Sequence, residues 1–264
     1  MISLSNIVVT FNPGTALEKR ALRGVSLDIP EGEFVTVIGS NGAGKSTLLG
    51  VLAGETPVTS GSVMIDGRDV TALPVQKRAD DVARVFQDPN VGVCGPLSIE
   101  ENLALAMMRG NARGLSRALT EERRQQFRER LKVLGMGLED RLGDRIGLLS
   151  GGQRQALSLL MATFAPSRIL LLDEHTAALD PKMADFVINL TRDLIAEFGL
   201  TAMMVTHSMG DALSCGTRTV MMHGGRKLID IQGGEREGMT PADFVALFSK
   251  TQGDDLTDDS LLLA

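Results

Sequence analysis

A glycine-rich stretch near the N-terminus has the residue types and spacing of a phosphate-binding loop. It reads GSNGAGKST from Gly39 to Thr47, follows the apolar FVTVI and leads into the helix-forming STLLGVLAG. This order satisfies the GxxxxGK[ST] pattern in the strand, loop and helix context that the pattern requires. Glycines let successive backbone N–H groups point inward, and the helix N-terminus adds a partial positive charge. The stretch therefore predicts a site for a nucleoside triphosphate.

Two side chains of this loop have predicted roles. Lys45 is expected to reach the β and γ phosphates, and the Ser46 hydroxyl is expected to bind Mg²⁺. The competing interpretation, a glycine-rich turn without a ligand, is disfavoured because the motif and its context agree. The residues expected to hold the nucleotide are Gly39, Ser40, Asn41, Gly42, Ala43, Gly44, Lys45, Ser46 and Thr47.

A second chemical cluster, Asp173, Glu174 and His175, closes the apolar run ILLL. The Mg²⁺ of a phosphate-binding loop needs a second oxygen donor, which such folds supply from a carboxylate at the end of a buried parallel strand. Asp173 is predicted to take that role. Side chains alternate along a strand, so Glu174 points elsewhere and is predicted to polarise the water that attacks the γ phosphate. His175 has no predicted function, because Mg²⁺ prefers oxygen to nitrogen.

A second helix N-terminus lies in LLSGGQRQALSLLMATFA, where Ser150 precedes Gly151 and Gly152. Backbone N–H groups exposed at a helix start suit a phosphate. The other interpretation is an ordinary helix cap by Ser150, and these residues alone leave both open. One γ phosphate can be shared by this helix start and the glycine-rich loop only if the two face each other. Two chains placed head to tail would provide that arrangement.

The elements that position these residues predict an α/β fold. Short β-rich runs up to GSVMIDG predict a small antiparallel sheet leading into a central strand, and residues 98–164 predict an inserted α-helical subdomain. The order RILLLDE, PKMADFVINLTRDLIAEFG and TAMMVTH predicts a βαβ unit of a parallel sheet, with Pro181 in the first helical turn and Gly199 at the C-cap. TVMMHGGRKLIDI predicts a hairpin that turns at Gly224 and Gly225.

Composition narrows the class of protein. The 264 residues are 43% apolar and 23% charged, with a net charge of −6, which fits a soluble globular chain and disfavours a general nucleic-acid binder. The longest apolar run, Leu103 to Met108, is far shorter than the roughly 20 residues of a membrane span. The N-terminus lacks the pattern of a secretion signal, and Cys94 and Cys215 lack a zinc spacing. A cytoplasmic protein is therefore expected.

The basic segment 109–132 is either a solvated helix face or a surface for a partner or anionic headgroups.

LSGGQRQ at 149–155, preceded by GSNGAGKST and followed by ILLLDE, resembles the ATP-binding subunit of an ABC transporter over nearly the whole chain. The resemblance implies a P-loop NTPase core with a parallel sheet, an N-terminal antiparallel β-subdomain and an inserted α-helical subdomain. It implies one ATPase domain over 1–250, with the helical subdomain at about 98–164, and an acidic tail over 251–264. ATP is then the nucleotide, and the chain works as a homodimer. The residues that would complete the partner's nucleotide site are Ser150, Gly151, Gly152 and Gln153.

Further residues take roles from this resemblance. Gln87 in VFQDP resembles the glutamine that senses Mg²⁺ and the attacking water, near the docking region of the transmembrane partner. Asp180 in AALDP resembles the aspartate that crosses the dimer interface, and His207 in TAMMVTH resembles the switch histidine that contacts the γ phosphate. Phe11 lies where the family places a ring against adenine, with ordinary apolar packing as the alternative. The expected catalytic residues are Glu174, His207 and Gln87, and the expected metal ligands are Ser46, Gln87 and Asp173.

His175 departs from the resemblance, because most members of the family have proline there. The string DEHTAALDP resembles a subgroup of bacterial importer ATPases with separate permease and solute-binding proteins, some of which carry aromatic amino acids. This implies a peripheral protein on the cytoplasmic face of the membrane that powers uptake of an amino-acid-like solute. Residues 88–102 and the basic helical segment are expected to face the permease. Two alternatives remain: an export ATPase, and a soluble ABC-type ATPase acting on nucleic acid or ribosomes.

Overall fold

The computed structural model describes residues 1–110 and 117–252, which divide into two compact units. The first unit is Met1–Arg78 together with Gly199–Ala264, and the second is Ala79–Phe198. Part of the predicted basic segment, 111–116, and the acidic tail from 253 onward lie outside the described residues. Within the described ranges, no helix combines the length and the apolar composition needed to cross a bilayer.

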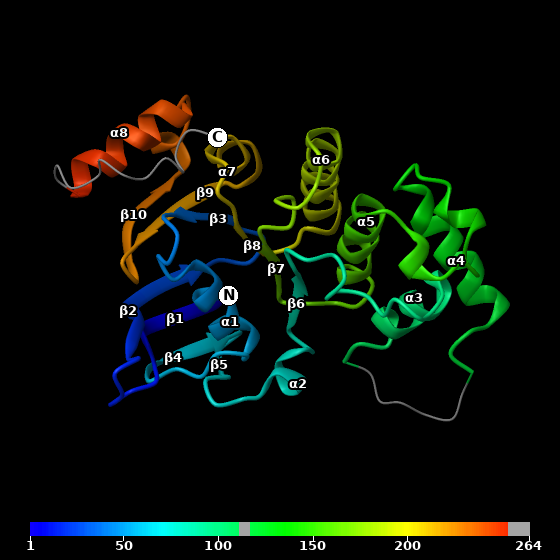
Figure 1. The fold of residues 1–264 in the computed structure, drawn as a ribbon, viewed down its shortest axis with the longest axis horizontal. Helices are drawn as coiled ribbons and strands as arrows, with labels where there is room; N and C mark the ends of the chain where they lie inside the picture. Colours follow the sequence, from blue (N-terminus) through cyan, green and yellow to red (C-terminus); the bar gives the residue numbers. More distant parts are fainter. Residues whose placement is uncertain (111–116, 253–264) are drawn as a thin grey trace. The chain divides into compact units, whose positions relative to one another are not determined.

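The first unit contains an antiparallel sheet with the strand order β2-β1-β4-β5, drawn in blue shades in Figure 1. It also contains the strand series β10-β9-β3-β8. Its strands are β1 (Ile2–Phe11), β2 (Lys19–Ile29), β3 (Phe34–Gly39), β4 (Ser60–Ile65), β5 (Arg68–Asp69), β8 (Ala202–Val205), β9 (Arg218–His223) and β10 (Arg226–Gln232). Its helices are α1 (Lys45–Ala53), α2 (Val75–Arg78), α7 (Met209–Cys215), the short 3-10 helix η3 (Gly233–Glu235) and α8 (Pro241–Gln252).

Strand β3 lies between β9 and β8 in the first unit, and it pairs with both of them in parallel. Val37 lies opposite Val205 of β8 and Val220 of β9. The run FVTVI is buried without alternation, as expected for a parallel strand covered on both faces. The predicted hairpin is confirmed, since β9 and β10 pair antiparallel and both turn residues, Gly224 and Gly225, have positive φ angles of 52° and 79°.

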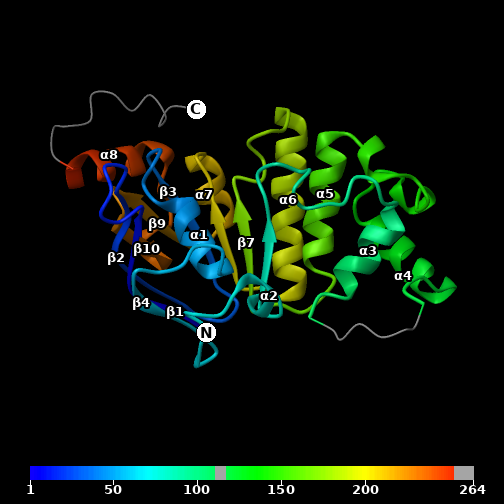
Figure 2. The ribbon, with the colours of Figure 1, turned by 60° about the horizontal axis from the view of Figure 1, so that its bottom comes forward.

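The second unit contains a parallel strand pair and four of the eight α-helices in the described part of the chain. Val85 of β6 lies opposite Leu172 of β7, and α5 and α6 lie side by side in both views (Figure 1 and Figure 2). Its strands are β6 (Val82–Val85) and β7 (Ile169–Asp173). Its helices are α3 (Ile99–Met107), α4 (Glu121–Lys132), α5 (Gly151–Ala162), α6 (Pro181–Phe198) and the short 3-10 helices η1 (Leu138–Asp140) and η2 (Ile146–Leu148).

The predicted α/β fold class is confirmed. The N-terminal part forms the antiparallel sheet, parallel strand pairs are present, and residues 98–164 carry helices α3, α4 and α5. The helical part has its own apolar core: Phe127 of α4 is fully buried, and its ring meets that of Phe164 edge-on at 5.8 Å between centroids. Helix α6 begins at Pro181, and Gly199 follows its last residue with a φ of 57°, as the sequence predicts.

Candidate functional site

The glycine-rich loop joins β3 to α1, and its glycines are required by close backbone contacts. A Cβ atom on Gly39 would lie 2.0 Å from the carbonyl oxygen of Met222, and one on Gly44 would lie 2.7 Å from that of Ala21. Gly39, Gly42 and Gly44 have positive φ angles of 146°, 77° and 99°. Only glycine adopts such angles without strain. The loop therefore curls back tightly on the strands behind it.

Lys45 places its ammonium group inside this loop. Its Nζ donates hydrogen bonds to the carbonyl oxygens of Gly39 at 2.7 Å and Ser40 at 3.1 Å, and the residue is 5% exposed. Helix α1 starts behind Gly44, and neither a side-chain cap nor an acidic residue occupies its first turn. The loop thus combines a buried positive charge with a helix N-terminus, which is the electrostatic environment that favours a phosphate group.

His207 emerges from the same sheet edge as the glycine-rich loop. Val37 and Val205 lie opposite each other in the parallel strands β3 and β8, and the Thr206 N–H donates to the Val37 carbonyl at 3.2 Å. Gly39 and His207 each lie two residues beyond this pair. The structure therefore brings the predicted phosphate loop and the predicted switch histidine together within the first unit. Phe11, also in this unit, ends β1 and is 41% exposed.

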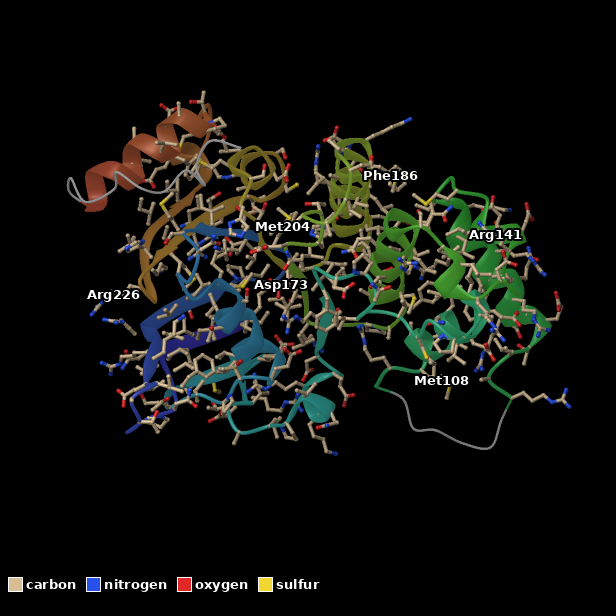
Figure 3. The ribbon with its side chains drawn as sticks, in the orientation of Figure 1. Met108, Arg141, Asp173, Phe186, Met204 and Arg226 are labelled. Atoms are coloured by element: carbon tan, nitrogen blue, oxygen red, sulfur yellow. The ribbon has the colours of Figure 1, made fainter. Side chains whose placement is uncertain are left out.

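In the second unit, the parallel strands β6 and β7 place three other predicted residues at one edge. Asp173 ends β7 and is labelled in Figure 3, Glu174 follows it, and Gln87 lies two residues beyond Val85 of β6. The strand register sets Val85 opposite Leu172, so Gln87 and Glu174 each lie two residues beyond the same pair.

Arg84 is a residue of this edge that the sequence did not single out. Its Nη2 lies 2.6 Å from Oδ2 of Asp173, and both side chains are 13% exposed. Its guanidinium also lies 4.7 Å from the centre of the Phe86 ring. The only signal in the sequence is an arginine within the otherwise apolar strand VARV. An ion pair sheltered from water fixes the direction of the Asp173 carboxylate.

Glu174 has an unusual backbone conformation for a residue with a side chain. Its φ angle is 44°, in the left-handed region that costs about 1–2 kcal/mol for an L-amino acid. Its carbonyl oxygen accepts a hydrogen bond from the Ala177 N–H at 3.0 Å, so a turn begins at Glu174. Strain of this kind is found where the surroundings fix one conformation, and it concentrates at functional sites.

His175 is a buried residue of this turn. It is 2% exposed, and its Nε2 lies 2.9 Å from Oγ1 of Thr191 in α6. Burial lowers the pKa of His175 to about 4, because water no longer stabilises the charged ring. The imidazole is therefore neutral near neutral pH. No role for His175 was predicted, and the structure shows that it has a specific partner 16 residues away.

Ser150 caps α5, as its position before the helix predicts. Its Oγ accepts from the Gln153 N–H at 3.2 Å, and Oε1 of Gln153 accepts from the Ser150 N–H at 3.1 Å, which forms a capping box. A Cβ on Gly152 would lie 2.6 Å from Cε of Met183, so this glycine has a packing role, whereas one on Gly151 would meet no atom within 4 Å. Ser150 is exposed, so the capped helix start still faces outward from its unit.

Two further side chains tie these segments of the second unit together. Gln155 is fully buried in α5 and donates from Nε2 to the carbonyl of Phe86 at 3.0 Å, which anchors the residue next to Gln87. A polar residue on the buried face of LSGGQRQ was the signal that could have revealed it. Asp180 precedes α6, and its Oδ1 accepts from the Met183 N–H at 3.2 Å.

The predicted metal ligands suit Mg²⁺ by their chemistry. Ser46 in the first turn of α1 offers a hydroxyl oxygen, while Asp173 and Gln87 offer carboxylate and amide oxygens, and a hard cation prefers such donors. Within 1–110 and 117–252, no cluster of three or more His, Cys, Asp or Glu residues could hold a metal ion. Few protein ligands are needed where substrate phosphates and water supply the rest of the Mg²⁺ coordination.

Comparisons with known proteins agree on one family. A family model described as ABC transporter matches residues 22–177. A tyrosine transport ATP-binding protein of Clostridioides difficile is 39% identical over 248 residues, which are 94% of this chain and 98% of that protein. A phosphonates import ATP-binding protein of Halobacterium salinarum is 36% identical over 242 residues, or 90% and 81% of the two chains. The fold is also similar to a solved structure, a dimeric ATP-binding cassette in a post-hydrolysis state bound to ADP and Pi. The TM-score is 0.75 and the identity is 32%, and the match covers 88% of this chain and 98% of that chain.

Proposed function

The chain belongs to the ABC transporter family as an ATP-binding and ATP-hydrolysing subunit, and we propose that it powers the import of an amino acid through separate permease subunits. The observation that supports this solute class is the 39% identity to a tyrosine transport ATP-binding protein, which extends over nearly the full length of both chains. The similarity to a phosphonates import protein supports the direction of transport but not the solute.

The first unit would bind and sense the triphosphate. Backbone N–H groups of Gly39–Thr47 and the Lys45 ammonium would hold the β and γ phosphates, which replace the two carbonyl oxygens that Lys45 now contacts. His207, at the same sheet edge, would contact the γ phosphate. Phe11, exposed at the end of β1, is available to stack on adenine.

The second unit would supply the groups for hydrolysis. Glu174 would polarise the water that attacks the γ phosphate, and Gln87 would orient that water. Ser46, Asp173 and Gln87 would hold Mg²⁺, which when bound neutralises the negative charge that develops on the phosphate oxygens. Oδ2 of the Asp173 carboxylate now pairs with Arg84, and a carboxylate has two oxygens that can accept or bind a cation.

A second copy of the chain would complete each nucleotide site. Ser150, Gly151, Gly152 and Gln153 of the partner copy would meet the γ phosphate, and Asp180 would lie at the interface between the copies. The capped and exposed start of α5 supports this assignment, since a helix N-terminus attracts an anion. ATP binding would then close the homodimer, and hydrolysis would reopen it.

Residues 88–102, the last four of which begin helix α3, are the stronger candidate for the permease-facing surface. They include Val91, whose apolar side chain is 60% exposed. Three basic residues of α4 have acidic partners within the second unit: Arg124 pairs with Glu100 at 2.7 Å, Arg128 with Glu121 at 3.2 Å, and Lys132 with Glu129 at 2.8 Å. These pairs favour a solvated helix face. Through the permease, the chain would lie on the cytoplasmic face of the membrane.

The experiment that tests the proposal measures ATP hydrolysis by the chain purified with the permease encoded beside it. We expect a binding protein loaded with tyrosine or a related amino acid to stimulate phosphate release several-fold, while the same protein without solute does not. Stimulation by phosphonate but not by amino acids would overturn the solute class. Co-purification with ribosomes or nucleic acid, with no response to any solute, would favour the soluble ATPase instead.

A further inference from the structure

We propose that His175 and Thr191 form a positioning pair that holds Glu174 in the direction required for ATP hydrolysis. The inference rests on the proposed role of Glu174 and goes beyond it, because it assigns a function to His175, which has no role in the proposed reaction. All of the residues involved belong to the second unit.

The need for positioning follows from the backbone of Glu174. Its φ angle of 44° is one that an L-amino acid leaves readily unless its neighbours prevent it. A change of this angle would swing the carboxylate away from its present direction. The residues before and after Glu174 must therefore hold the chain in place.

On one side of Glu174, the chain is held at Asp173. The ion pair to Arg84, with 2.6 Å between Nη2 and Oδ2, joins Asp173 of β7 to the neighbouring strand β6. This contact fixes where the strand ends. It does not determine how the chain turns after the strand.

On the other side, the hydrogen bond between His175 and Thr191 holds the turn. The Thr191 hydroxyl donates its single proton to the carbonyl of Val187, four residues earlier in α6, at 2.7 Å. Its oxygen can therefore only accept from His175, which assigns the ring proton to Nε2. With His175 and Thr191 exposed by 2% and 0%, water does not compete for this bond.

Helix α6 gives the pair a rigid support. Thr191 lies within the 18-residue helix Pro181–Phe198, and the Asp180 side chain fixes the start of this helix through the Met183 N–H. The turn that begins at Glu174 is closed by the Ala177 N–H, and its second residue is His175. Glu174 is thus the single residue between two anchored neighbours, so its carboxylate direction depends on both.

The test removes the hydrogen bond from each end while preserving side-chain volume. His175→Leu removes the donor, and Thr191→Val removes the acceptor. We expect the kcat for ATP hydrolysis to fall about 10-fold to 100-fold in each, as small misplacements of reacting groups do, while ATP affinity and KM change less than twofold. The double variant should lose no more than the worse single variant, because both changes break the same bond.

Conservative variants provide the matched control. His175→Gln keeps an N–H donor near the position of Nε2, and Thr191→Ser keeps the hydroxyl, so both should retain at least about half of the wild-type kcat. If the Leu variant fails to fold, the comparison of Thr191→Val with Thr191→Ser decides the question. Thermal unfolding and ATP binding, measured by calorimetry on each variant, confirm that the folded protein is being compared.

Several outcomes would overturn the inference. One is wild-type kcat in Thr191→Val, and another is equal loss of kcat in the Val and Ser variants. Glu174→Gln distinguishes a failure of the positioning pair from a failure of the proposed role of Glu174. If it abolishes hydrolysis while the His175 and Thr191 variants stay active, only the positioning pair is wrong. If Glu174→Gln itself hydrolyses ATP at the wild-type rate, the proposed role of Glu174 fails first.

Discussion

Lys45 and Glu174 should separate nucleotide binding from nucleotide hydrolysis. Lys45 is a buried cation held by two carbonyl oxygens inside a glycine loop, which suits a group that binds phosphate. Glu174 is an acid at the start of a turn, next to the Asp173 carboxylate and held in a strained conformation. The two side chains belong to different units of the chain.

Replacing Glu174 by Gln should stop hydrolysis and leave binding intact. The amide keeps the size of the side chain but is a far weaker base, so we expect kcat to fall about 10²-fold to 10⁴-fold. Phosphate release and ATP binding, measured on the same preparation, check this. Glu197→Gln, a change at an exposed position of α6, is the control and should keep the wild-type kcat. Turnover near the wild-type rate in Glu174→Gln would remove this residue from the role of base.

Replacing Lys45 by Ala should weaken ATP binding itself. Loss of a charge-assisted hydrogen bond to phosphate is expected to lower the affinity about 10-fold to 100-fold. Calorimetric titration with ATP measures the change, and Lys182→Ala, at an exposed lysine, serves as the control. An unchanged affinity in Lys45→Ala would mean that the triphosphate is held elsewhere.

The sequence predicted the residues whose chemistry depends on near neighbours and missed those whose partners are distant. Lys45 meets carbonyls only six and five residues away, so a local pattern revealed its loop. Arg84 and Gln155 meet partners 89 and 69 residues away. Those contacts exist only once the register of β6 with β7 and the packing of α5 are set, and no spacing in the chain encodes them directly.

Among the secondary-structure elements, the hairpin of β9 and β10 is stabilised by a cluster of ion pairs that links its two strands. Arg218 of β9 donates from Nε and Nη2 to the two carboxylate oxygens of Asp230 in β10, at 2.6 Å and 2.8 Å, and Lys227 donates to the same carboxylate at 2.6 Å. Burial alone would raise the pKa of Asp230, but these hydrogen bonds outweigh it and lower the pKa from its ordinary value.

The contribution of this ion-pair cluster to the free energy of unfolding should depend on pH. A carboxyl group whose pKa is lower in the folded chain adds stability at pH values above its unfolded pKa of about 4, and this contribution is lost as pH falls through the folded value. At pH 7 we expect Asp230→Asn to lower the free energy of unfolding by about 1 kcal/mol, allowing for solvent screening, which lowers the melting temperature by about 2–4 °C.

Thermal unfolding across a pH series measures this effect. The difference between Asp230→Asn and the wild type should shrink as pH drops below about 4, because protonation then removes the charge from both folded and unfolded Asp230. The control, Asp193→Asn, changes an exposed carboxylate and should match the wild type throughout. A difference that stays constant with pH would show that the carboxylate charge is not what stabilises the hairpin.

The elements themselves were predictable to different degrees. The β9–β10 hairpin followed from two glycines between apolar runs, and α5 and α6 followed from their caps, since these signals are local. The pairing of β3 with both β8 and β9 did not, because parallel strands are joined by long connections whose order sequence periodicity does not reveal. The turn at Glu174 also escaped prediction, since its φ angle depends on anchors in β6 and α6.

For the whole molecule, the proposed function requires two copies of the chain. A variant of Ser150 can test the contact between the copies without weakening the N-cap of α5. Ser150→Asp keeps a good N-cap for α5 but adds a negative charge that would repel the partner's γ phosphate. We expect this variant to unfold like the wild type and to lose ATP-dependent dimer formation in light scattering. Ser150→Thr retains both the cap and the hydroxyl and should still form dimers. An ATP-dependent dimer in Ser150→Asp would exclude Ser150 from the shared site.

The most direct measurement is the structure of the Glu174→Gln variant crystallised with ATP and Mg²⁺. We expect two copies with two nucleotides, and Oγ of Ser150 in one copy within about 3 Å of the γ phosphate bound by the glycine loop of the other. A structure in which each ATP touches only one copy, with Ser150 in solvent, would contradict it.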